Sequence, residues 1–209
     1  MNLVVQEGYG HNYYHWYHYK SGYSHYVGGS LNPVRSCINS TSMGDYEPAY
    51  GCTLSVINEL HCRLIGIGIG AVNVINGYCI GSLVALGCNY FSNTFDMIGV
   101  YVAPVNWSFW ASPNLVMGIV AGLVNRIGGG LDSDRCVGLV VGLFYNTVRC
   151  SMIGLSLSLG FQHSEYLRGV QLGVLNSCGE KSAGLQIGLL NFRTGSYLPI
   201  PFLAIRRRI

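Results

Sequence analysis

The sequence predicts an all-β fold that is built from repeats, and three observations predict it. Residues 64–125 contain a single charged side chain, Asp96. An octapeptide of the form G-h-x-h-G-h-h-N, where h is apolar, recurs along the chain, most clearly in residues 169–176 and 184–191. Within each copy, bulky and small residues alternate with a period of two, which is the period of a β-strand. A unit that recurs in this way is stacked or paired with its neighbours, so it determines the architecture.

The repeat covers most of the chain, in eight units that begin 15 to 20 residues apart. The units that start at Gly81 and Gly138 reach their asparagines, Asn89 and Asn146, one residue late, as a β-bulge would allow, and the unit that starts at Gly154 is degenerate. Residues 51–58 form a weaker additional unit. The repeat positions that we expect to be structural are Gly66, Gly70, Asn73, Gly99, Asn106, Gly118, Gly122, Asn125, Gly138, Gly142, Gly169, Gly173, Asn176, Gly184, Gly188 and Asn191.

Each strand has one bulky apolar side and one side of glycine, alanine, serine or glutamine. In the last unit, Leu185, Ile187 and Leu189 alternate with Gly184, Gln186 and Gly188. Glycine inside a strand usually marks the close approach of another backbone, so we expect tight packing at every unit. The asparagine is expected to end the strand and begin a turn. The charged residues of the repeat region are expected in solvent-facing turns: Asp132, Asp134, Arg135, Arg149, Glu165, Arg168, Glu180, Lys181 and Arg193.

These strands fit two architectures. The first is an antiparallel meander, which in its closed form is a β-barrel whose bulky side contacts lipid. The alternative is a β-solenoid, in which we expect the bulky side to lie inside. The chain divides into a Tyr- and His-rich N-terminal region, 1–50, which is partly loop and is expected to be loop over 28–50, a repeat array, 51–205, and a basic tail, 206–209.

The composition excludes some classes of function. Half of the residues are hydrophobic and 10% are charged, against roughly 25% charged residues in ordinary soluble domains. Such a chain buries most of its surface, contacts lipid or binds neighbours. The net charge of +3 is too small to predict a nucleic-acid partner. No signal peptide is visible, so either the chain stays in the cytoplasm or its start lies upstream.

The eight cysteines form no C-x-x-C pair, so their pattern does not favour a zinc site. We interpret them as small, mostly reduced packing residues, with a disulfide framework as the alternative.

The N-terminal region carries the one candidate metal site. Nine of the fifteen tyrosines lie within residues 1–50, together with four of the six histidines. On a helix, His11, His15 and His18 would share one face and could hold a metal ion. The alternative is an aromatic surface strand or arm that has no ligand.

No catalytic motif is present in the sequence. It contains no P-loop, no Gly-x-Ser-x-Gly and no His-Glu-x-x-His. His163 and Glu165 are close in sequence, and we expect them in a solvated turn. We therefore predict no enzymatic activity and no cofactor.

Residues 169–176 and 184–191, with the ending 191–202, resemble a family of bacterial surface repeats that is built from GVQIGLLN-type octapeptides. The resemblance covers about residues 64–205. It implies a location at the cell envelope or outer membrane and implies no catalysis.

Three functional hypotheses follow. The first is a non-catalytic repeat-built β protein of the bacterial cell envelope or surface, with a structural or membrane-barrel role. The second is a soluble β-repeat scaffold that binds a protein or a ligand. The third is a metal-binding protein that acts through its N-terminal histidines. A membrane or another protein is the expected partner, and the sequence leaves the oligomeric state open.

Overall fold

The structure is a computed structural model that describes residues 2–8, 11–17, 26–31, 35–39, 48–61, 63–93, 96–111, 114–128, 134–196 and 198–206. Every regular element in these ranges is a β-strand, so the predicted all-β class is confirmed. The strands are β1 (Asn2–Gly8), β2 (His11–Tyr17), β3 (Tyr26–Leu31), β4 (Arg35–Asn39), β5 (Pro48–Leu54), β6 (Ile57–His61), β7 (Arg63–Ile75), β8 (Cys79–Asn93), β9 (Asp96–Val102), β10 (Val105–Ala111), β11 (Leu115–Ile127), β12 (Arg135–Cys178), β13 (Gly184–Arg193) and β14 (Ile200–Arg206).

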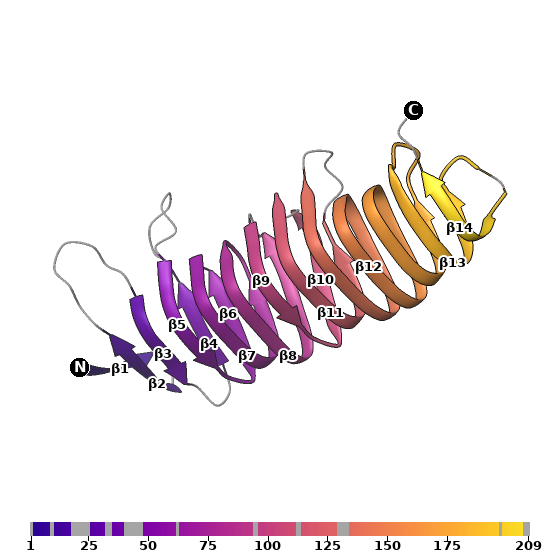
Figure 1. The fold of residues 1–209 in the computed structure, drawn as a ribbon. Coiled ribbons are helices and arrows are strands. Elements are labelled where there is room, and N and C mark those ends of the chain that lie inside the picture. Colours follow the sequence, from indigo (N-terminus) through magenta and orange to yellow (C-terminus); the bar gives the residue numbers. More distant parts are fainter. Residues whose placement is uncertain are drawn as a thin grey trace.

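The strands wind into a β-solenoid, which Figure 1 shows as an elongated stack of coils that runs from β3 at one end to β13 at the other. Neighbouring coils pair in parallel, and equivalent repeat positions lie side by side: Gly66 pairs with Gly81, and Gly81 pairs with Gly99. The predicted antiparallel meander and closed barrel are therefore wrong, and the alternative, a solenoid, is correct. Period-two alternation is common to both architectures. A repeat whose identical residues stack in register, however, needs parallel coils.

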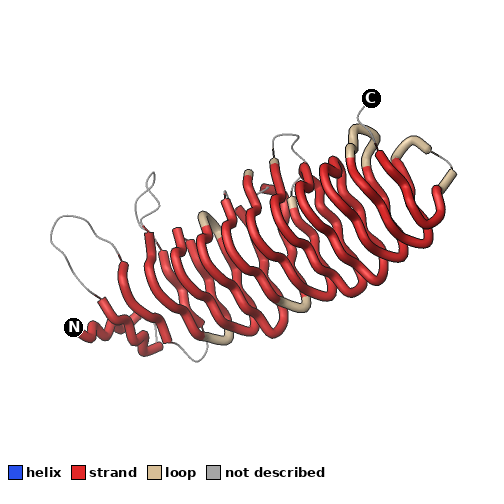
Figure 2. The backbone as a smooth tube through the Cα atoms, in the orientation of Figure 1, coloured by secondary structure: helices blue, strands red, loops and turns tan. Residues whose placement is uncertain are grey.

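Antiparallel strands cover both ends of the parallel stack. At the N-terminal end, β1 pairs with β2, and β2 pairs with β3. At the C-terminal end, β14 runs antiparallel to β13. Figure 2 shows the stack as almost continuous strand between these ends. Repeat arrays need terminal elements that differ from the internal units, because an uncovered end exposes a row of unpaired backbone groups.

The first glycine of each unit forms a column along the solenoid. From Gly51 to Gly154 these glycines have positive φ values of 133° to 157°. A β-carbon at Gly118 would overlap the carbonyl oxygen of Gly99, and one at Gly138 would overlap that of Gly118. The column therefore needs glycine both for its backbone conformation and for the close approach of successive coils.

The repeated asparagines form a second column, inside the solenoid. The side-chain nitrogen of each residue donates to the side-chain oxygen of the next, over 2.7 to 2.9 Å, along Asn58, Asn73, Asn89, Asn106, Asn125 and Asn146. All six are fully buried. We call this column the asparagine ladder. The expectation that asparagine ends each strand is wrong, since these side chains satisfy buried polar groups inside continuing strands.

The ladder is interrupted once and then resumes. In the unit of Gly154, Phe161 occupies the asparagine position, and the amide of the following Gln162 donates to Asn176 instead. Asn176 then donates to Asn191 over 2.7 Å. In these last coils the interior also becomes polar, because Gln186 donates to Gln171 over 2.8 Å. An apolar core that includes Leu83, Val120 and Val140 also lies in the interior.

Two register shifts confirm the expected bulges. Gly70 pairs with Ala85 and Val72 with Cys88, so β8 contains one residue more than β7. The same shift separates β11 from β12. The extra residues include Leu86 and Phe144, which are 84% and 60% exposed. The bulges therefore absorb the late asparagines and keep the ladder in register.

Three further expectations differ from the structure. Segments of residues 28–50, expected to be loop, belong to β3, β4 and the start of β5, and Gly28 pairs with Gly51, so the parallel array begins before residue 51. Arg149, Glu165 and Arg168 lie within β12 rather than in turns, because successive coils there continue without a loop. Asp134, expected to face solvent, is fully buried.

Candidate interaction surface

The outward side of the glycine-containing strand segments is a continuous apolar surface. Relative to the first glycine of a unit, positions −1, +1 and +3 point outward and position +2 points inward. In β11, for example, Met117 and Ile119 are exposed whereas Val120 is buried. We call this surface the aliphatic face and number its rows from the unit of Gly66 to that of Gly184. Its rows are Ile65, Ile67, Ile69; Ile80, Ser82, Val84; Ile98, Val100, Val102; Met117, Ile119, Ala121; Val137, Leu139, Val141; Ile153, Leu155, Leu157; Arg168, Val170, Leu172; and Ala183, Leu185, Ile187.

Strand pairing aligns these side chains into columns. Ile119 pairs with Val100 on one side and with Leu139 on the other. The face continues beyond its eight rows, because Leu54 of β5 pairs with Ile69, and Leu203 of β14 pairs with Ile187. Leu54 and Leu203 are 46% and 52% exposed. The apolar surface therefore extends from β5 to the terminal strand.

The bulky side chains lie outside because the interior has no room for them. A β-carbon at Gly70 would lie 2.8 Å from the side-chain nitrogen of Asn58, and one at Gly68 would lie 2.7 Å from Leu83. The interior at these positions is already filled by the asparagine ladder and its neighbours. The expectation that a solenoid places the bulky side inside is therefore wrong: the internal side is the one that carries the glycines, together with core residues such as Leu83 and Val120 at position +2.

The aliphatic face is larger than the apolar patches of ordinary monomers. Rows spaced about 4.8 Å apart and columns spaced about 6.7 Å apart give the eight rows an area of roughly 750 Å². The largest patch on a typical monomeric protein is roughly 300–600 Å² and often has a function. Only Ser82 and Arg168 depart from the apolar composition of the face. They lie in the second row from each end.

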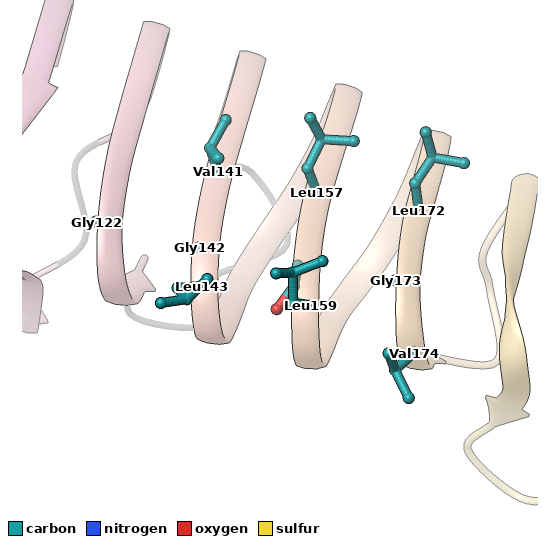
Figure 3. Close-up of a pocket in the computed structure, with 10 residues that line it drawn as sticks. Gly122, Val141, Gly142, Leu143, Leu157, Leu159, Leu172, Gly173 and Val174 are labelled. Carbon is teal, nitrogen blue, oxygen red and sulfur yellow. The ribbon is translucent and has the colours of Figure 1, made fainter.

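A groove runs along one border of the aliphatic face. It has a volume of about 540 Å³ and lies between two columns of side chains, at positions +3 and +5 of successive units. Figure 3 shows Val141, Leu157 and Leu172 along one side, and Leu143 and Leu159 on the other. The backbone between the two columns forms the floor, because position +4 points inward: a β-carbon at Gly142 or Gly173 would meet the buried Asn146 or Asn176. The groove can receive aliphatic side chains, and its walls offer almost no polar partner.

The strand segments that follow the asparagines carry a more polar surface. The guanidinium of Arg126 lies 4.7 Å above the ring of Trp107. The imidazole Nε2 of His163 lies 3.8 Å from a carboxylate oxygen of Glu165, and its Nδ1 is 3.1 Å from the hydroxyl of Ser177. Burial lowers the pKa of His163, and the nearby Glu165 carboxylate opposes that shift. The Glu165 carboxylate and the Ser177 hydroxyl thus lie beside the two ring nitrogens of His163, all three within β12.

The predicted metal site falls largely outside what the structure describes. His11 and His15 belong to β2, but the placement of their side chains is not described, and His18 lies outside the described residues. Among the side chains that are described, no group of three or more His, Cys, Asp or Glu residues could hold a metal ion. The metal hypothesis for His11, His15 and His18 therefore stays a prediction.

Cys79, Cys136, Cys150 and Cys178 are buried and form no disulfide. Cys52, in β5, is exposed and also forms none. Burial raises the pKa of Cys136 to about 12 and also raises that of Cys150. These buried thiols act as small packing residues, in agreement with the interpretation of the cysteines from the sequence.

Sequence reasoning identified the bulky positions but not the surface that they form. The columns of the aliphatic face follow directly from aligning the units on their first glycine, and this alignment would also have singled out Ser82 and Arg168. The missing information was the direction of the side chains, which depends on how the interior is filled.

Comparison with known proteins found no family model that matches the chain and no similar curated protein or solved structure. Among the described residues, no helix has the length and apolar character that a membrane span requires.

Proposed function

We propose that this chain is a non-catalytic β-repeat scaffold that binds other macromolecules through its aliphatic face. The observation that carries the proposal is the face itself, which places half-exposed aliphatic side chains such as Ile67, Val100 and Ile119 in register along the solenoid. Such a surface is costly to leave in water, at about 25 cal/mol for each Å² of apolar area. An extended apolar surface of this kind is typical of an interaction site.

The internal construction supports a structural role. The solenoid is held by columns of glycine and hydrogen-bonded asparagine that repeat from coil to coil. Each column fixes the spacing of the coils, and this in turn fixes the spacing of the outward side chains. The repeated residues thus maintain a regular surface, which is what a scaffold requires.

We place this scaffold at the bacterial cell envelope or cell surface. The support is the resemblance of residues 169–176 and 184–191 to bacterial surface repeats. The aliphatic face is consistent with that location, since an envelope offers apolar partners in both proteins and lipids.

Photo-crosslinking in cells tests the proposal. A benzoylphenylalanine at position 119, on the aliphatic face, should give covalent adducts after illumination. The matched control at position 149, where Arg149 is exposed outside this face, should give few or none. Fractionation of the same cells should recover the adducts with the envelope. Equal adducts at both positions would overturn the binding role of the face, and adducts confined to the soluble fraction would overturn the envelope location.

A further inference from the structure

We propose that the occupant of the aliphatic face is a second copy of this chain, packed face to face in antiparallel orientation. This inference rests on the proposed function, because it names the partner of the same surface. The two copies are related by a two-fold axis that runs along the strand direction between the rows of Ile119 and Leu139. The first row of one copy then faces the eighth row of the partner, and the second row faces the seventh.

The size of the face fits a stable dimer. Its eight rows give roughly 750 Å², and the continuation onto β5 and β14 raises this to roughly 950 Å². A standard protein interface buries about 800 Å² on each partner. The contact between rows also resembles the packing of two sheets in a β-sandwich, whose facing side chains fill a layer about 10 Å thick.

The spacing of the rows favours a copy of the same chain over an unrelated partner. Successive coils place aliphatic side chains at the regular separation of paired β-strands, so ridges and grooves alternate at that period along the face. A partner fits into every groove only if its own ridges have the same period. A second copy has this period in every row, whereas a single helix has a rise and pitch that do not match it.

The two polar positions of the face select the antiparallel orientation. Ser82 lies in the second row and Arg168 in the second row from the other end, and both are at least partly exposed. In the antiparallel dimer each Arg168 faces the row of the partner that contains Ser82, so its guanidinium has a hydroxyl acceptor there. In a parallel dimer both Arg168 residues would lie in the same row of the interface among aliphatic side chains. Burying two like charges together is strongly unfavourable.

The oligomeric state of the full-length chain tests the proposal, measured by sedimentation velocity over a range of concentrations. The wild-type chain should be a dimer. Ile119→Lys places a charge in the central rows of both copies and should weaken association by about 100-fold or more, as loss of a central interface residue does. Leu198→Lys is the matched control, since Leu198 is 80% exposed and lies in the β13–β14 connection, off the face. It should leave the dimer intact, and circular dichroism should show the same β spectrum for both variants.

A charge exchange tests the orientation. Ser82→Glu should preserve or tighten the dimer, because the new carboxylate lies opposite the row of the partner copy that contains Arg168, one column away from it. Ser82→Lys should weaken it by about 10-fold or more, as like charges do across an interface, and Arg168→Glu in the same chain should restore it. Equal effects of Ser82→Glu and Ser82→Lys would overturn the antiparallel arrangement.

Further outcomes show whether this inference fails alone or together with the proposed function. A wild-type chain that stays monomeric overturns the dimer, as does a dimer that Ile119→Lys leaves unchanged. If that monomer nevertheless binds phosphatidylglycerol vesicles and Ile119→Lys abolishes the binding, the aliphatic face remains a binding surface with a lipid partner. A monomer that gives no adduct from position 119 in cells overturns the dimer and the proposed function together.

Discussion

The side-chain nitrogen of Asn125 donates a hydrogen bond of 2.7 Å to the side-chain oxygen of Asn146, and both residues are fully buried. The second hydrogen of the same Asn125 amide goes to the backbone oxygen of Val141, also over 2.7 Å. One side chain thus connects two coils of the solenoid through both of its donors. The same arrangement holds Asn106 against Asn125 and the backbone oxygen of Ala121. Each asparagine depends on its neighbours for its own satisfaction.

Replacing Asn125 should therefore destabilise the solenoid more than its size suggests. Asn125→Ala removes three hydrogen bonds, those with Val141, Asn146 and Asn106, and each partner group left unpaired costs about 1–3 kcal/mol. We expect a loss of about 3 kcal/mol or more in the free energy of unfolding, measured by urea titration. The control is Asn114→Ala, because Asn114 is exposed. Similar losses in the free energy of unfolding for Asn125→Ala and Asn114→Ala would show that the asparagine ladder does not specifically stabilise the solenoid.

The glycines of the repeat should tolerate substitution according to what surrounds them. A β-carbon at Gly188 would overlap the backbone oxygen of Gly173, whereas one at Gly195 would meet only the end of the Glu180 side chain. We expect Gly188→Val to prevent correct folding or to cost about 4 kcal/mol or more, which is exceptional for one substitution. Gly195 has a φ of 82°, and Gly195→Asn should be tolerated because asparagine adopts that conformation at low cost. Circular dichroism and thermal unfolding of the two variants measure the difference. If both unfold like the wild type, the close packing of Gly188 against Gly173 is not needed.

His163 should make the stability depend on pH. Burial lowers its pKa in the folded chain below the unfolded value of about 6.5. Above that value both states are neutral and the stability is unaffected. As the pH falls below about 6.5, the unfolded chain binds a proton first, so the folded state loses stability until its own lower pKa is passed. His163→Gln should remove this part of the pH dependence in urea titrations between pH 7 and pH 5. Identical pH profiles for the wild type and His163→Gln would contradict the prediction that His163 makes the stability depend on pH.

The thiols should differ in reactivity. Cys52 is exposed, whereas Cys136 and Cys150 are buried and have raised pKa values, so they form little thiolate near neutral pH. A brief treatment of the native protein with N-ethylmaleimide, followed by peptide mass spectrometry, should label Cys52 and spare the other two. Labelling in urea, where all three are open to solvent, provides the control. Rapid labelling of Cys136 in the native protein would show that the core is not closed there.

The strand content and the unit boundaries could be predicted from the sequence because both depend on local pattern. Alternation in residues such as Leu185 to Leu189 predicts a strand, and the spacing of the glycines predicts the period. The bulge that accommodates Asn89 was also predictable, since it follows from counting residues within a unit. These features need no knowledge of what lies across the strand.

Two features could not be predicted in the same way: whether neighbouring strands run parallel or antiparallel, and which side of each strand faces inward. An antiparallel barrel and a parallel solenoid produce the same alternation, and only the pairing of Gly66 with Gly81 separates them. The usual association of bulky residues with the interior also fails here, because the interior at Gly70 is filled by Asn58 and Asn73. From the sequence, asparagine predicts a turn. In the solenoid, however, the asparagine side chains of successive coils hydrogen-bond to one another, because the coils are in register. That arrangement depends on contacts between residues 15 to 21 positions apart.

The most direct test of the solenoid is nuclear magnetic resonance of the chain labelled with ¹⁵N at asparagine. If the asparagine ladder exists, the side-chain amide protons of Asn73, Asn106 and Asn125 should exchange slowly with solvent. Nuclear Overhauser contacts should then connect each buried amide to the next along the ladder, including Asn106 to Asn125 and Asn125 to Asn146. Rapid exchange of these side-chain amides, at the rate of the exposed Asn114, would contradict the parallel in-register architecture and the aliphatic face that depends on it.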